Sequence, residues 1–64
     1  MVRVIVDKKE EYTFKTPISV GKILKELGFL PFEVLVIKGD KLLTRDVVLR
    51  DESRIEIRVV YSKG

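Results

Sequence analysis

Residues 19–28, SVGKILKELG, are the part of the chain whose apolar residues repeat with the period of an α-helix. The stripe occupies positions i, i+3, i+4 and i+7: Val20, Ile23, Leu24 and Leu27. Ser19 precedes it as a typical N-cap residue, and Gly28 follows it where a left-handed residue ends many helices. The pattern predicts one helix of about nine residues whose single apolar face must pack against a sheet.

Two segments before this helix have the pattern of β-strands. Residues 2–6, VRVIV, are β-branched, and residues 11–16, EYTFKT, alternate polar and aromatic side chains. The charged residues 7–10 between them predict the turn of a hairpin. In this hairpin we expect Tyr12 and Phe14 to face the core.

The chain after the helix returns to strand patterns. Residues 34–37, VLVI, predict a strand that turns at residues 38–41 and returns over residues 42–43. Residues 47–49 predict a loop or a brief edge strand. Residues 54–60 alternate, which turns three apolar side chains inward: Ile55, Ile57 and Val59. Three charged side chains then face outward: Arg54, Glu56 and Arg58.

The order β-β-α-β-(β)-β predicts an α+β fold with a mixed sheet of four to five strands and one main helix. The first and last strands then lie side by side and parallel in the middle of the sheet. This arrangement is the β-grasp, or ubiquitin-like, architecture. We expect one domain over residues 1–64, with a mobile tail at residues 61–64 because it follows the last strand.

The composition argues against catalysis by the chain itself. The 64 residues include no Cys and no His, which excludes disulfides, the usual zinc sites and imidazole catalysis. We therefore expect no catalytic residue, no metal and no cofactor. The acidic residues Asp46, Asp51 and Glu52 lie among arginines, so we interpret them as members of surface ion pairs.

The charge pattern and the apolar runs bear on location and partners. The net charge is +3, and basic and acidic residues interleave, which is typical of a solvated surface; nucleic acid is an unfavoured partner. No apolar run approaches the length of a signal sequence or the roughly 20 residues of a membrane span, so we expect a cytoplasmic protein. Many Lys and Glu, with no Asn, Gln or Cys, indicate a heat-adapted (thermophile) source.

The last four residues are Tyr61, Ser62, Lys63 and Gly64. An extended tail of this length reaches about 13 Å beyond the last strand. Glycine has no β-carbon, so Gly64 can enter a narrow active site of a partner, where ATP can adenylate its carboxylate. The alternative is a frayed terminus that ends in glycine.

Three segments carry a family resemblance: residues 16–29, TPISVGKILKELGF, residues 36–41, VIKGDK, and residues 49–57, LRDESRIEI. Together they resemble the ThiS/MoaD sulfur-carrier family. The resemblance implies that a ubiquitin-activating-type enzyme adenylates Gly64, which then becomes a thiocarboxylate. The sulfur would pass to a synthase of thiamine or molybdopterin biosynthesis or to tRNA thiolation, or the terminus would join a protein lysine.

The chain departs from that family at three places. Lys63 stands where the family has the first glycine of a terminal Gly-Gly pair. Residues 51–53, Asp-Glu-Ser, replace the Asp-Gly-Asp turn, and Lys38 replaces the usual Asn before Gly39.

Strand alternation also predicts a surface for partners. Ile5 faces the open side of the sheet, Val60 lies there beside Arg58, and one pair of residues 34–37 joins them, which forms an apolar protein-docking patch. Two alternatives would explain the same apolar residues: they are β-branched because they lie in the middle of a sheet, or they form a dimer contact. A second interpretation is a TGS-like RNA- or protein-binding regulatory module that uses Arg54 and Arg58, although Glu56 interrupts that basic row.

Overall fold

The predicted helix is present in the computed structural model, which describes residues 1–60, and its ends are fixed by local hydrogen bonds. Helix α1 spans Val20–Leu27. The Ser19 hydroxyl accepts a hydrogen bond from the Lys22 backbone N–H (3.1 Å), as expected of an N-cap. Gly28 ends the helix in the left-handed region (φ 83°), which glycine adopts without steric cost.

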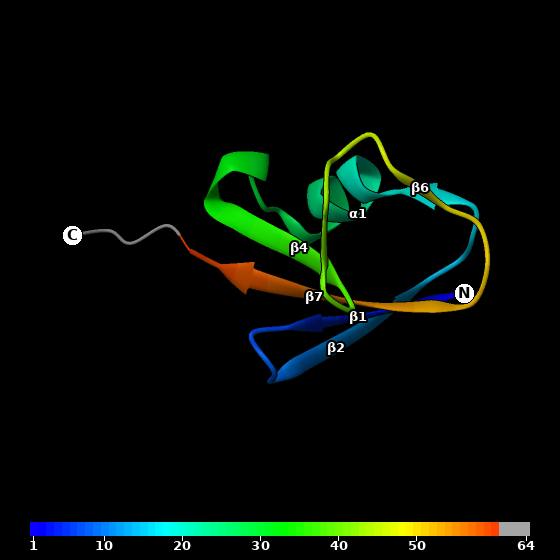
Figure 1. Ribbon diagram of the computed structural model, residues 1–64, viewed down its shortest axis with the longest axis horizontal. Helices are drawn as coiled ribbons and strands as arrows, with labels where there is room; N and C mark the ends of the chain where they lie inside the picture. The colour runs from blue at the N-terminus through cyan, green and yellow to red at the C-terminus, as the bar shows by residue number, and fades with distance from the viewer. Residues whose placement is uncertain (61–64) are drawn as a thin grey trace.

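A five-stranded mixed sheet lies beneath this helix (Figure 1). In chain order its strands are β1 (Val2–Val6), β2 (Glu10–Phe14), β4 (Val34–Lys38), β5 (Lys41–Leu43) and β7 (Ser53–Val59). Their order across the sheet is β2-β1-β7-β4-β5, in which β1 and β7 are parallel and the other pairs antiparallel. The prediction of a mixed sheet with the first and last strands parallel at its centre is confirmed.

Three short elements complete the fold. Strand β3 (Ile18–Ser19) pairs with β6 (Val48–Leu49) in a separate two-stranded sheet, and the 3₁₀ helix η1 (Pro31–Glu33) leads into β4. The pairing of β3 with β6 ties the start of α1 to the segment before β7. Among residues 1–60, no helix is long and apolar enough to cross a membrane.

The core fills the space between α1 and one face of the large sheet. Val20, Ile23 and Leu24 of the predicted stripe are buried and Leu27 packs against them, and Ile55 and Ile57 point inward as predicted. The predicted inward placement of Val59 does not bury it: Val59 is 40% exposed at the end of β7. The buried residues are Val2, Val4, Val6, Val20, Ile23, Leu24, Val34, Val36, Leu49, Ile55 and Ile57.

Tyr12 is on the predicted face of β2, but it is not buried. Tyr12 lies opposite Val4 on the core side of the sheet, yet it is 39% exposed, and its hydroxyl donates to the Glu10 carboxylate (3.2 Å). Strand β2 is one of the two edge strands of the sheet. Figure 1 shows α1 above β4 and β7, so the helix does not cover Tyr12. Phe14, opposite Val2, packs against the core as predicted.

Candidate functional site

The face of the large sheet that points away from α1 carries the residues predicted to form a docking surface. Successive side chains of a strand point to opposite faces of the sheet. The residues that alternate with the buried ones along each strand therefore point to this open face. The register aligns Ile5, Glu56, Ile37 and Leu42 in one row across β1, β7, β4 and β5. Arg58 and Leu35 are paired in the next row.

The continuous apolar part of this face is formed by Leu35, Ile37 and Leu42, which we call the open-face patch. Leu35 is 39% exposed and Leu42 is 66% exposed, whereas Ile37 is half-buried. The half-buried Ile5 lies on the same face but is separated from Ile37 by Glu56. The pair expected from residues 34–37 is therefore Leu35 and Ile37, and Leu42 adds a member that sequence reasoning missed.

Basic side chains border the open-face patch at both ends of β7. Arg58 is exposed beside Leu35, and Arg54 lies next to Arg3 in the parallel register of β1 and β7. The Arg3 guanidinium forms an ion pair with Glu11 (2.9 Å). Glu56 lies between Arg54 and Arg58 along the strand, so the basic row is interrupted, as the sequence predicts.

The end of β7 is held from both sides by hydrogen bonds. The Val59 N–H donates to Asp7 Oδ1 (3.1 Å), and the Val60 N–H donates to the Glu33 carbonyl (3.0 Å). Asp7 also donates its own N–H to the Ile57 carbonyl (2.9 Å). These bonds fix the last described residues of the chain, including Val60, which is 51% exposed.

Asp7 occupies this position because of the local geometry of the hairpin turn. Asp7 and the following Lys8 both have left-handed backbones (φ 50° and 61°). Asp and Asn are the side-chain-bearing residues that adopt this region most readily. The predicted tail residues Tyr61, Ser62, Lys63 and Gly64 come directly after Val60 and lie outside the described residues.

Of the three acids predicted to form surface ion pairs, Glu52 pairs with the N-terminal amine of Met1 (3.5 Å), whereas within residues 1–60 Asp46 and Asp51 have no ion-pair partner, so the prediction is wrong for these two. Within residues 1–60, the ion pairs are Met1 N-terminus–Glu52, Arg3–Glu11 and Lys22–Glu26. The Asp46 carboxylate instead accepts a hydrogen bond from the Thr44 hydroxyl. This bond, followed by one from the backbone of Asp46 and a smaller effect of Arg45, lowers the pKa of Asp46.

No protein-family model matches the chain, and no curated protein shows a significant match. A functional assignment therefore depends on the sequence motifs, on the open-face patch and on the way β7 ends.

Proposed function

We propose that this chain is a small cytoplasmic sulfur carrier of the ThiS/MoaD type with a β-grasp fold. Its mixed sheet, with β1 parallel to β7 and one helix across one face, agrees with that architecture. Residues 16–29, 36–41 and 49–57 carry the resemblance in sequence. In this proposal Gly64 is the working residue, and an adenylating enzyme and a sulfur-accepting synthase are the partners.

The observation that carries the proposal is the anchored end of β7 beside an exposed apolar surface. Exposed apolar patches of this kind mark protein–protein contacts. Hydrogen bonds from Val59 to Asp7 and from Val60 to Glu33 hold the chain up to the residue before the tail. A partner that docks on the open-face patch would therefore receive the tail from a fixed starting point, which favours a defined reaction geometry.

The chemistry requires no catalytic side chain from the carrier. The Gly64 carboxylate attacks the α-phosphate of ATP in the partner's active site, and pyrophosphate leaves. A sulfide sulfur then attacks the acyl-adenylate carbon and displaces AMP, which leaves a thiocarboxylate on Gly64. The partner supplies the acids and bases, which agrees with a chain without His and Cys.

Intact-mass spectrometry tests the working residue. The protein is incubated with ATP, sulfide and a candidate activating enzyme, and one terminal oxygen should be replaced by sulfur. Deletion of Gly64 should abolish this exchange without a change in melting temperature. Lys63→Gly should react at least as well as the natural chain; if only Lys63→Gly gains sulfur, the natural chain is not a sulfur carrier.

Calorimetry tests the docking surface. Leu42→Lys and Ile5→Lys should weaken binding to the activating enzyme while the circular dichroism spectrum stays unchanged. Val48→Lys is the matched control, because Val48 is also exposed but belongs to the β3–β6 sheet. Equal affinities of all three variants and the natural chain would remove the open-face patch from the proposal.

A TGS-like RNA-binding module is the second candidate, favoured by the adjacent Arg3 and Arg54 on the open face of a chain with net charge +3. Its test is the affinity for a short single-stranded RNA across a range of salt concentrations. A steep fall with salt, reduced by Arg54→Gln, would support this function. The absence of binding at low salt would exclude it.

A further inference from the structure

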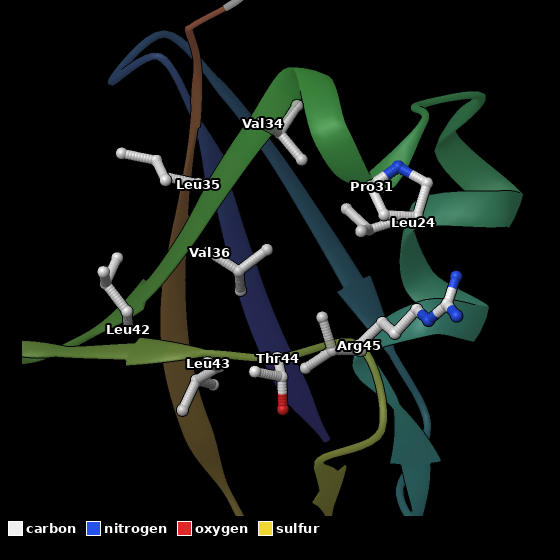
Figure 2. A pocket seen from close by; sticks show the side chains of 10 residues that line it. Leu24, Pro31, Val34, Leu35, Val36, Leu42, Leu43, Thr44 and Arg45 are labelled. Atoms are coloured by element: carbon white, nitrogen blue, oxygen red, sulfur yellow. The ribbon is translucent and has the colours of Figure 1, made fainter.

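A groove opens at the edge of the large sheet where β5 ends early. Strand β5 pairs with Val36, Ile37 and Lys38 of β4, and its register places no residue opposite Val34. After β5 the chain crosses to α1, where the Gly21 N–H donates to the Arg45 carbonyl (2.8 Å). The resulting groove has a volume of about 320 Å³ and lies between β4, β5, η1 and α1 (Figure 2).

The walls of this groove are apolar. They are formed by side chains that come from all four elements: Val20, Leu24, Pro31, Val34, Val36 and Leu43. Figure 2 shows Val34, Val36, Leu24 and Pro31 around one space, and Leu35 and Leu42 of the open-face patch also line the groove. The volume is at the lower end of the range of about 300–1,000 Å³ for small-molecule sites, so the groove suits one or two side chains of a peptide.

Arg45 is the charged residue of the groove lining, and it has no anionic partner among residues 1–60. No carboxylate oxygen of the described residues lies within 4.0 Å of its guanidinium nitrogens. The next residue, Asp46, accepts a hydrogen bond from the Thr44 hydroxyl instead. A guanidinium beside an apolar wall is complementary to a ligand that presents a carboxylate next to an apolar side chain.

Gly21 holds Arg45 in place. A β-carbon at position 21 would lie 3.2 Å from the Arg45 carbonyl oxygen and 3.6 Å from Arg45 Cβ. Glycine within a helix is unfavourable by about 1 kcal/mol relative to alanine, and here it permits close contact between α1 and the segment that carries Arg45. The backbone of Arg45 is therefore fixed before any ligand arrives.

The edge of β4 offers a backbone acceptor in the same groove. Glu33 accepts a hydrogen bond from Val60 on the β7 side, and successive residues of a strand direct their backbone groups to opposite edges. The carbonyl of Val34 therefore points to the edge that β5 leaves open. An extended peptide can donate an N–H to such a group, as in strand addition to a sheet edge.

We propose that this groove binds an extended segment of a partner protein in which an apolar side chain lies next to a carboxylate. The apolar side chain enters between Leu24, Val34 and Val36, and the carboxylate pairs with Arg45. The groove adjoins the open-face patch, because Leu35 and Leu42 belong to both, but the bound side chain contacts the core-side residues Leu24, Val34 and Val36. It needs neither Gly64 nor a sulfur donor.

The test uses a capped hexapeptide with leucines on both sides of a central aspartate, titrated into the ¹⁵N-labelled protein. Amide signals of residues 34–36 and 43–45 should shift. Replacement of the aspartate by asparagine should weaken binding about tenfold, because a charge-assisted hydrogen bond contributes on the order of 1.5 kcal/mol. Arg45→Gln should have the same effect on the aspartate peptide and none on the asparagine peptide.

Arg50→Gln is the matched control, since Arg50 is exposed and lies outside the groove lining. Its affinity for the aspartate peptide should equal that of the natural chain. Shifts confined to the open face of β1 and β7, equal affinities for the two peptides, or no shift in residues 34–36 and 43–45 at millimolar peptide would each overturn the proposal. Chemical shifts of the free Arg45→Gln protein show that its fold is intact.

Discussion

Asp7 joins two parts of the chain that are 52 positions apart, because its carboxylate accepts the N–H of Val59. The sequence indicates only a charged turn at this point. The residues next to Asp7 in the sequence do not indicate that its side chain contacts the distant end of β7. This part of the candidate site could not be predicted from local pattern, whereas the alternation of β7 was sufficient to place Arg58 on the open face.

Asp7→Ala should lower the free energy of unfolding by about 1–3 kcal/mol, because it removes a hydrogen-bond acceptor and places alanine at a left-handed backbone. Asp7→Asn keeps an acceptor and tolerates the same backbone, so its unfolding free energy should stay within about 0.5 kcal/mol of the natural value. Urea denaturation measures both. Hydrogen exchange at the Val59 amide should accelerate in the alanine variant alone; equal exchange in both would contradict this role.

Thr44→Val should raise the pKa of Asp46 toward its ordinary value, since the Thr44 hydroxyl is the main cause of its lowering. A carboxyl whose pKa is lower in the folded than in the unfolded chain stabilises the fold above the unfolded pKa. That contribution is lost as the pH falls through the folded pKa. The natural chain should therefore lose more stability than Thr44→Val on acidification, and a carboxyl ¹³C titration should show the pKa change directly.

If both proteins titrate alike at Asp46, the hydrogen bond from Thr44 does not persist in solution.

Among the elements, those with local signals were predicted well. Helix α1 begins after Ser19 and ends at Gly28 as expected, since cap, stripe and stop residue all lie within ten positions. The brief strand expected as one alternative at residues 47–49 is β6, but β3 has only two residues and its pairing with β6 across the chain leaves no periodicity to detect. The exposure of Tyr12 escaped prediction for a related reason: sequence alternation gives the face of a strand but not its distance from the covering helix.

Ser19→Ala should destabilise the protein by about 1 kcal/mol, because the Lys22 N–H loses its acceptor at the start of α1. Ser19→Asp should retain most of the stability, since aspartate is an equally good N-cap and its charge favours the helix N-terminus. Thermal denaturation followed by circular dichroism distinguishes the two. A loss of equal size in both variants would assign the effect to the β3–β6 pairing instead of the cap.

At the scale of the whole molecule, the sheet order follows from the segment order, but the surface does not. The parallel centre was predictable because two strands precede one helix and the last strand is strongly alternating. The groove beside Arg45 was not, since it results from the three-residue length of β5 and from the path of the chain afterwards. A surface groove of this kind depends on where neighbouring strands end, and the alternation of apolar and polar residues does not predict the end of a strand.

Ile57→Ala should lower the unfolding free energy by about 2–5 kcal/mol, because Ile57 is fully buried at the centre of the sheet. A domain of this size has a total stability of only about 3–10 kcal/mol, so a large unfolded fraction should appear at moderate temperature. Val48→Ala, at an exposed position, should change stability by less than about 0.5 kcal/mol. Calorimetric melting curves that coincide for the two variants would contradict the proposed core.

The parallel contact between β1 and β7 also determines how the molecule responds to a pulling force. Traction on the start of β1 and the end of β7 acts in opposite directions along two adjacent strands. The ladder between them is then loaded in shear, so its hydrogen bonds must break together and not one after another. The fold should therefore resist stretching between its ends far better than its modest size suggests.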